Sequence, residues 1–308
     1  MKALQVGFLG ANLIVLQTKF SISKILRNIL LPGLETRPIV KNDVYLPKYL
    51  NTLYHLKTRH VMKFLIGAFF LMASLTSFTN KVDTRFYELR IYYCHPGKLN
   101  TLIERFKNHT TTLFQKHGME NVGYWLPTSN EQNALYYILA YPNKTARENS
   151  WTAFRKDPEW QEVVRKSEEN GKIVARVTSV FMTASELSPA IKPSSTRAER
   201  SFELRTYHPA PGKYPELITR FKKHALGFFK KYKMENIGYW NTVDSLKAQP
   251  DLVYMLAYKT EAEGRKAWAE FLKDPKWVKA KAESEKNGKL VDSVESVYLK
   301  PLEFSTIK

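Results

Sequence analysis

The chain has 308 residues, of which 44% are apolar, and this length and composition predict about two ordinary globular domains. Its only cysteine, Cys94, excludes an intrachain disulfide and a thiolate metal cluster. The net charge is +19, and residues 78–308 alone carry 38 basic and 27 acidic side chains, a net +11. Because these basic residues alternate with glutamates along predicted helices and no nucleic-acid-binding module accompanies them, we expect no nucleic-acid partner.

The first 80 residues have the pattern of a leader rather than of a domain. Residues 1–61 carry nine Lys/Arg and two acidic residues. Residues 62–80 resemble a signal peptide, because Met62 and Lys63 precede an apolar run that is too short for a comfortable membrane span. On this interpretation the chain starts at Met62, residues 1–61 are a spurious extension, and the protein is extracytoplasmic, either periplasmic or secreted. The alternative is an authentic leader that makes the protein mitochondrial or membrane-anchored, with membrane contact through the N-terminal segment alone.

Residues 85–187 predict a first domain with the order strand, helix, strand, strand, helix, strand. Strands are indicated by aromatic and β-branched residues, and helices by apolar residues at helical spacing. The predicted elements are a strand at 85–92, a helix at 98–118, strands at 121–126 and 134–141, a helical stretch broken at Asp157-Pro158, and a strand from about 171 to 182. This is the split βαβ order of a ferredoxin-like unit.

The same order recurs in a second predicted domain, residues 201–304, after a linker rich in Pro and Ser at residues 188–200. The strongest match joins Phe106–Trp125 to Phe221–Trp240, which lie 115 positions apart and are identical at 11 of 20 places. The loop between the second and third strands is two residues longer in the second copy. Such a repeat requires each copy to be the same supersecondary unit.

The repeat determines the expected fold class. A four-stranded antiparallel sheet with helices on one side leaves its other face open, and that face is apolar here. We therefore predict an α+β protein in which two tandem ferredoxin-like (βαββαβ) repeats cover each other as a pseudo-dimeric α/β barrel. The alternative is two separate units that each dimerise with another chain. The expected assembly is accordingly a monomeric pseudo-dimer or a homo-oligomer.

Several motifs together resemble the NIPSNAP family. They are a Phe/Tyr-Glu-Leu-Arg strand, a Pro-Gly-Lys turn, a Phe-x-x-His helix, a Met-Glu-Asn-x-Gly-Tyr-Trp strand and a Trp-x-x-Phe-x-x-Asp-Pro-x-Trp helix, each present twice. The resemblance implies the dimeric α/β-barrel superfamily, which also includes cofactor-independent monooxygenases, haem-degrading enzymes and dehydratases. It implies no settled catalytic activity, although animal members are associated with mitochondria and with partner binding. The secretory-type segment and the two well-matched copies depart from the animal pattern and favour a bacterial, exported relative.

A candidate cleft follows from the repeated polar and aromatic residues. Its members are His109, His224, Tyr124, Tyr239, Trp125, Trp240, Arg90 and Arg205. Each histidine lies three residues after a buried phenylalanine, where the imidazole could act as a general base or hydrogen-bond donor between walls of Tyr and Trp. The structural alternatives are that each histidine bonds a backbone carbonyl, and that Arg90 and Arg205 pair with Glu88 and Glu203. Two isolated histidines do not make a metal site, and we expect neither a metal nor a cofactor.

The sequence contains no complete catalytic constellation, so whether the protein is an enzyme stays open. The first interpretation is an exported NIPSNAP-type module that binds a hydrophobic small molecule or a protein partner. The alternative is a cofactor-independent, monooxygenase-like α/β-barrel enzyme that acts on a hydrophobic or aromatic small molecule. A third possibility is a purely structural or membrane-surface protein, which the remaining +11 charge would suit if the basic residues cluster.

Overall fold

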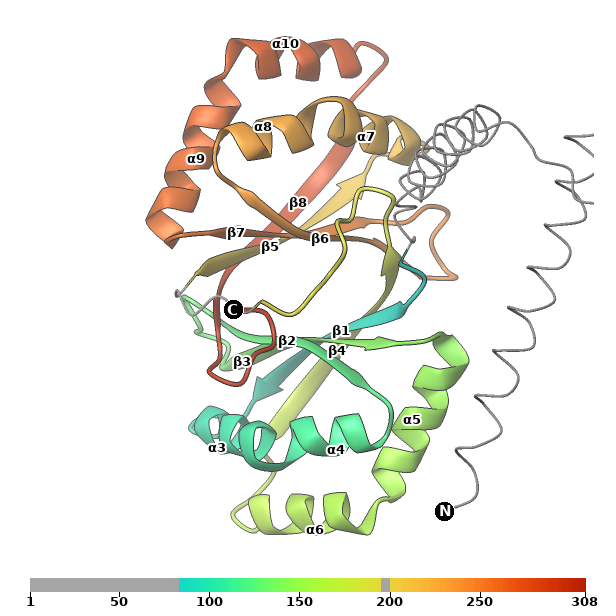
Figure 1. Cartoon of the computed structure of the whole chain (residues 1–308), viewed down its shortest axis with the longest axis vertical. Helices are drawn as coiled ribbons and strands as arrows, with labels where there is room; N and C mark the ends of the chain where they lie inside the picture. Colours follow the sequence, from blue (N-terminus) through green and yellow to red (C-terminus); the bar gives the residue numbers. More distant parts are fainter. Residues whose placement is uncertain (1–82, 195–199) are drawn as a thin grey trace, which may run out of the picture. The chain divides into compact units, whose positions relative to one another are not determined.

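A computed structural model describes residues 83–194 and 200–308, which form a closed barrel of eight antiparallel strands with helices outside it (Figure 1). The predictions for residues 1–61 and for the signal-type segment 62–80 lie outside the described residues. None of the helices in the described ranges has both the length and the apolar character that a membrane span needs.

The first half of the barrel has the predicted element order. It consists of β1 (Phe86–Cys94), α3 (Leu99–Arg105), η1 (Phe106–Thr110), α4 (Thr111–Lys116), β2 (Glu120–Pro127), β3 (Ala134–Tyr141), α5 (Lys144–Lys156), α6 (Pro158–Ser167) and β4 (Val174–Ala184). Strand β1 lies in the middle of this sheet, where Leu89 pairs with Ile138 on β3 and with Val180 on β4. The spatial order β4-β1-β3-β2 is that of a ferredoxin-like sheet.

The second half repeats this arrangement. It consists of β5 (Ser201–Pro209), α7 (Tyr214–Arg220), η2 (Phe221–Ala225), α8 (Leu226–Lys231), β6 (Glu235–Thr242), β7 (Leu252–Tyr258), α9 (Glu261–Lys273), α10 (Pro275–Ser284) and β8 (Val291–Pro301). Here Leu204 on β5 pairs with Met255 on β7 and with Val297 on β8.

The two sheets join at both edges within the same chain. Residues 125–127 of β2 pair with residues 299–301 of β8, and residues 182–184 of β4 pair with residues 240–242 of β6. The barrel is therefore a pseudo-dimer of two α+β repeats, as the sequence predicts. The alternative of two separate units is wrong, because all four edge strands find their partners inside the chain.

The first helical stretch of each repeat contains a π-helical turn that the sequence pattern does not predict. The stretch expected as one helix at 98–118 divides into α3, the π-helical η1 and α4, and the second half divides in the same way at η2. The later break at Asp157-Pro158 is present as expected. The Asp157 carboxylate accepts a hydrogen bond from the Glu159 backbone N–H at 2.9 Å, and Pro158 occupies the first turn of α6.

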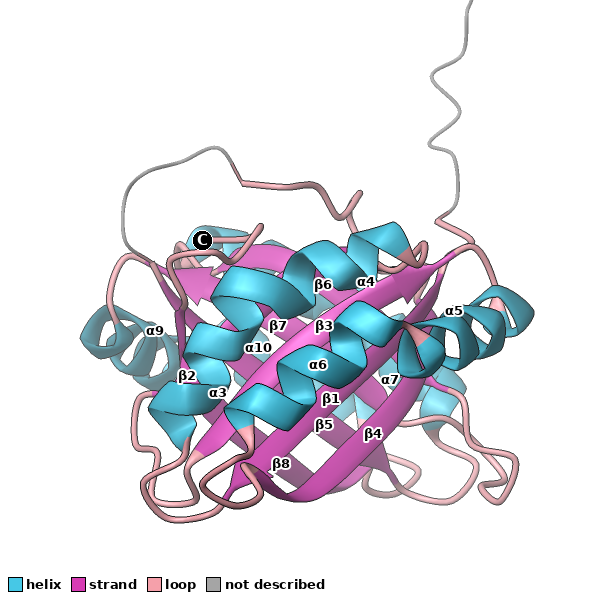
Figure 2. Ribbon diagram, turned by 90° about the horizontal axis from the view of Figure 1, so that it is seen from below, coloured by secondary structure: helices cyan, strands magenta, loops and turns pink. Residues whose placement is uncertain are grey.

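Alternation along the strands divides the core into a lumen and two helix-covered layers. On β1, Tyr87 and Leu89 point into a lumen cluster that both halves share, whereas Phe86 belongs to the layer beneath the helices of the first half. A separate cluster fills the corresponding layer of the second half. Residues 188–194 and the C-terminal tail lie at one end of the barrel, uppermost in Figure 2, where Ile191 and Ile307 join the lumen cluster.

Candidate functional site

A cavity of about 610 Å³ lies at the end of the barrel where β5 ends and β7 begins. Its lining includes lumen-facing residues of both halves, among them Leu89 and Val180 from the first and Thr206 and Val253 from the second. The loop between β6 and β7 forms part of its rim through Asp244 and its neighbours. The cavity thus belongs to the closed barrel rather than to either repeat alone.

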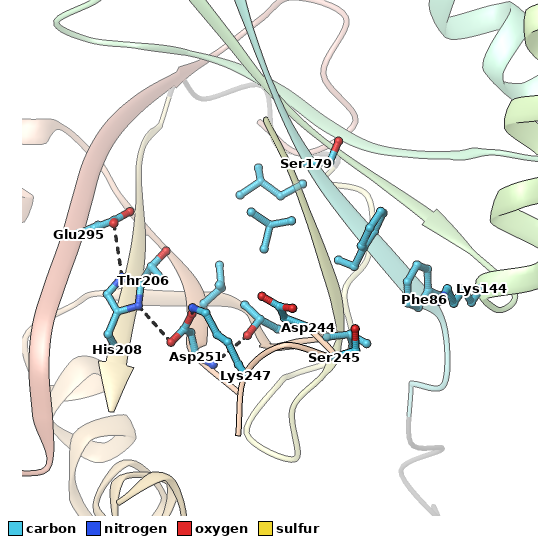
Figure 3. A pocket seen from close by; sticks show the side chains of 16 residues that line it. Phe86, Lys144, Ser179, Thr206, His208, Asp244, Ser245, Lys247, Asp251 and Glu295 are labelled. Atoms are coloured by element: carbon cyan, nitrogen blue, oxygen red, sulfur yellow. Dashed lines mark hydrogen bonds and ion pairs between the residues drawn. The ribbon is translucent and has the colours of Figure 1, made fainter. Parts of the chain in front are cut away.

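Three titratable side chains on this cavity form a chain of contacts, shown in Figure 3. The Nδ1 atom of His208 lies 3.0 Å from Oδ1 of Asp251, and its Nε2 atom lies 3.4 Å from Oε1 of Glu295. Asp251 also forms an ion pair with Lys247 at 2.5 Å. The Asp251 side chain is 10% exposed, whereas that of Glu295 is 77% exposed. The imidazole therefore has one fixed carboxylate on Nδ1 and one solvent-exposed carboxylate near Nε2.

Local hydrogen bonds hold the backbone around the His208–Asp251 contact in place. The Asp251 backbone N–H donates to the Thr242 hydroxyl at 2.8 Å, and the Thr242 N–H donates to the Asp251 carbonyl at 3.0 Å. The Gln249 side-chain amide donates to the carbonyls of Pro209 and Ala210, each at 2.9 Å. The β6–β7 loop is therefore tied to the end of β5, and His208 at the end of that strand meets Asp251 at the start of β7.

The first half does not carry this group at the equivalent positions. When the repeats are aligned, Tyr93, Ala134 and Thr178 of the first half stand at the positions of His208, Asp251 and Glu295, respectively. Ile91 and Tyr136 stand at the positions of Thr206 and Val253. The register supports the alignment, because Tyr93 pairs with Ala134 on the neighbouring strand. Tyr136 is itself packed against the lumen cluster. The carboxylate–imidazole contact is thus specific to the second half, which also has the longer loop.

The NIPSNAP sequence profile matches residues 87–189 and 202–306, which together exceed half of the chain. This chain belongs to the NIPSNAP family. The protein NipSnap homolog 3A of Homo sapiens and that of Pongo abelii are each 28% identical to it over 244 residues, covering 77% of this chain and 91% of the relative.

Solved structures extend the likeness at the level of the fold. A candidate monooxygenase from Fusobacterium nucleatum superposes with a TM-score of 0.50 at 10% identity, covering 73% of this chain and 98% of that one. A NIPSNAP-like domain protein from Burkholderia xenovorans is 20% identical, with a TM-score of 0.33, and covers 37% of this chain and 97% of that chain. The predicted family and the predicted barrel are both confirmed.

The two repeated histidines of the NIPSNAP domains lie outside the barrel, in the π-helical turns. His109 is exposed and lines a groove of about 430 Å³ between η1 and α6, whereas His224 is half-buried in η2. Neither imidazole makes a hydrogen bond or an ion pair with another residue in the described part of the chain. The structure therefore places them apart from His208 and from the barrel cavity.

The repeated aromatic residues point to two different faces of the sheet. Tyr124 and Tyr239 are buried beneath the helices, and their hydroxyls donate to Asn121 and Asn236 respectively. In contrast, the adjacent Trp125 and Trp240 project into the lumen. The eight residues predicted as one cleft are thus distributed over the outer helices, the helix-covered layers and the lumen.

Arg90 and Arg205 each pair with a buried glutamate on the helix-covered side. Arg90 Nη1 lies 2.6 Å from Glu88, and Arg205 Nη1 lies 2.5 Å from Glu203. Glu88 also accepts hydrogen bonds from Arg147 and from the Trp151 indole. Burial alone would raise the pKa of Glu88, but the hydrogen bond from Arg147 and the charges of both arginines outweigh it and lower that pKa.

The predicted cleft does not include the polar residues of the cavity, because its members are all at positions that both repeats share. His208, Asp251 and Glu295 occur where the repeats differ, and the longer β6–β7 loop was the signal that could have located them. No group of three or more His, Cys, Asp or Glu residues in the described ranges is arranged to hold a metal ion.

Proposed function

We propose that this NIPSNAP protein is a small-molecule-binding module that holds one hydrophobic ligand per chain in the barrel cavity. The single observation that supports the proposal is the cavity of about 610 Å³ with the Asp251–His208 contact on its wall. Ligand sites commonly have volumes of roughly 300–1,000 Å³ and combine apolar walls with a few placed polar groups.

The lining indicates the chemistry of the ligand. Phe86 and Val180 supply apolar surface, while Thr206 and His208 supply hydrogen-bonding groups. Phe86 and His208 lie on opposite sides of the cavity (Figure 3). The ligand that suits this arrangement has an apolar, aromatic-sized body and one polar group directed toward His208.

Filling the cavity tests the proposal. We expect the fluorescent probe anilinonaphthalene sulfonate to bind saturably with one site per chain, and Thr206→Trp to weaken its binding roughly tenfold or more by occupying the cavity. The matched control is His109→Trp, on the exposed outer helix, which should bind the probe like the unaltered protein. Equal affinity for the probe in Thr206→Trp and the unaltered protein would contradict the proposal. In that case a protein partner, the other interpretation from the sequence, becomes the better one.

Export is part of the proposal and rests on residues 62–80 alone. N-terminal sequencing and intact mass of the protein from its native host should give a mature start between Phe78 and Lys81. A mature start at Met1 would contradict export and would favour the mitochondrial or membrane-anchored alternative.

A cofactor-independent enzyme is the second candidate function. The observation that favours it is the contact between Asp251 and His208, because a carboxylate on Nδ1 orients an imidazole for proton transfer at Nε2.

A further inference from the structure

We propose that His208 is a general base that removes a proton from carbon in a ligand bound in the barrel cavity, and that Asp251 is its positioning residue. The substrate class is an enolisable carbonyl compound with an apolar body. The inference rests on the proposed function, since it requires a ligand in the same cavity.

The first argument is the orientation of the imidazole. With Asp251 3.0 Å from Nδ1, the tautomer that carries hydrogen on Nδ1 donates to the carboxylate and leaves Nε2 as the acceptor. The backbone N–H of Asp251 donates to the Thr242 hydroxyl, and its carboxylate forms an ion pair with Lys247, so the imidazole is oriented by a fixed group. This is the arrangement of base and orienting group that proton-transfer sites require.

The second argument is the route of the proton after transfer. Glu295 Oε1 lies 3.4 Å from Nε2, and its side chain is 77% exposed. Once Nε2 has taken up the proton, a carboxylate beside it that reaches solvent can accept that proton and pass it to water. The buried Asp251 cannot do this, because its own contacts hold it at Nδ1.

The step balances without an oxidant or a cofactor. The proton moves from the carbon atom to Nε2, and the electron pair of the C–H bond remains on the ligand as an enolate. Return of a proton to another atom of the enolate completes an isomerisation. The base is regenerated when Nε2 gives its proton to that atom or, through Glu295, to water.

The experiment uses the full chain and the carbon acid 5-nitrobenzisoxazole. The isoxazole ring of this flat aromatic compound opens when a suitably positioned base removes its C–H proton. Removal of its C–H proton forms the nitrile, breaks the N–O bond and releases a coloured nitrophenolate. We expect turnover of this probe, and His208→Gln should lower kcat by roughly 10²- to 10⁴-fold while binding of the probe is unchanged. His208→Tyr is a second variant, because Tyr93 occupies the same position in the first half. The matched control His109→Gln should turn over like the unaltered protein.

Asp251→Asn separates positioning from a merely structural role. If Asp251 orients the imidazole, this variant should lower kcat by roughly tenfold or more with an unchanged KM. A variant that only loosened the fold would change KM and the melting temperature as well.

The two levels of the proposal fail differently. If 5-nitrobenzisoxazole binds but is not turned over, or if His208→Gln and His208→Tyr turn it over as fast as the unaltered protein does, the general base is refuted and the binding site stands. If neither 5-nitrobenzisoxazole nor anilinonaphthalene sulfonate binds the unaltered protein saturably, the proposed function fails together with the inference.

Discussion

At the scale of single residues, the two repeats show how one buried carboxylate is satisfied in two ways. Glu88 and Glu203 occupy equivalent positions and are both almost completely buried. Glu88 meets two arginines, whereas Glu203 meets one arginine and accepts a hydrogen bond from Ser296 at 2.6 Å. The difference arises because Gly264 stands in the second repeat where Arg147 stands in the first.

Neutralising Glu88 should therefore destabilise the protein more than neutralising Glu203. Glu88→Gln leaves Arg90 and Arg147 without their anionic partner, and we expect the free energy of unfolding in urea to fall by about 3–5 kcal/mol. Glu203→Gln removes the partner of a single arginine and should cost less. Glu303→Gln, on the exposed surface, is the control and should not change the unfolding curve. Equal losses for Glu88→Gln and Glu303→Gln would contradict a stabilising role for the network.

Cys94 provides a test of burial at one atom. Burial raises the pKa of its thiol to about 11, although the nearby Arg105 opposes the shift. In the unfolded chain the thiol should titrate near its ordinary value of about 8.5. A raised pKa contributes stability that is complete below about pH 8.5 and is lost as the pH rises toward 11. We expect iodoacetamide at pH 8.5 to modify the native protein roughly tenfold or more slowly than the urea-unfolded protein. Equal rates would contradict the burial of Cys94.

At the scale of elements, the predicted strands and the broken helices agree well with the structure, and the reasons are local. Aromatic and β-branched residues that alternate predict β1, and a continuous apolar run ended by Pro142 predicts β3, each within about two residues at its ends. Asp157 and Pro158 supply a cap and a first turn at the break. The π-helical turns were not predictable in this way, because the apolar spacing of Phe106 and its neighbours also fits an uninterrupted α-helix.

A glycine in each second strand has a spatial reason for being glycine. A Cβ atom added at Gly123 would lie 2.2 Å from the Trp125 indole, and the equivalent Gly238 would clash with Trp240 in the same way. The chain must lack a side chain there because the indole of the next inward-facing residue folds back over the backbone. Each glycine thus allows a large ring to fill the lumen.

Gly123→Ala should destabilise the protein by about 1–3 kcal/mol, because the buried indole of Trp125 has to shift. Gly227→Ala is the matched control within α8, where an added Cβ would meet nothing within 4 Å. Removing a helical glycine at this exposed position should instead stabilise the protein by about 0.5–1 kcal/mol. Urea unfolding of both variants checks the prediction. A loss of stability in Gly227→Ala, or none in Gly123→Ala, would contradict it.

At the scale of the whole molecule, the repeat predicted the closed barrel but not the cavity. Closure follows from two apolar sheet faces in one chain. The contact between His208 and Asp251 depends on two strands from different parts of the sequence meeting at the barrel end, and neither residue is shared with the first repeat. His109 was predicted as a site residue because it is repeated, and the structure places it on the outer helices. The residues that both repeats share thus predict the fold, whereas the titratable residues of the cavity wall are ones that differ between the repeats.

The two halves contribute to a single lumen core. Tyr87 of the first half packs against Trp240 of the second with ring centroids 5.8 Å apart, and Trp125 packs against Phe202 at 5.9 Å. Both β2–β8 and β4–β6 pairings cross between the halves. Opening one half would therefore expose the apolar lumen face of the other and leave its edge strands unpaired.

We expect the barrel to unfold in one cooperative transition. In differential scanning calorimetry, Glu88→Gln in the first half and Glu203→Gln in the second should each lower the melting temperature of the same transition. A loss of about 3–5 kcal/mol for Glu88→Gln corresponds to a decrease of roughly 6–20 °C for a folded region of this size. If either variant instead splits the trace, so that one half melts at its original temperature, the shared lumen does not couple the halves. The repeats would then be independent domains that merely contact each other.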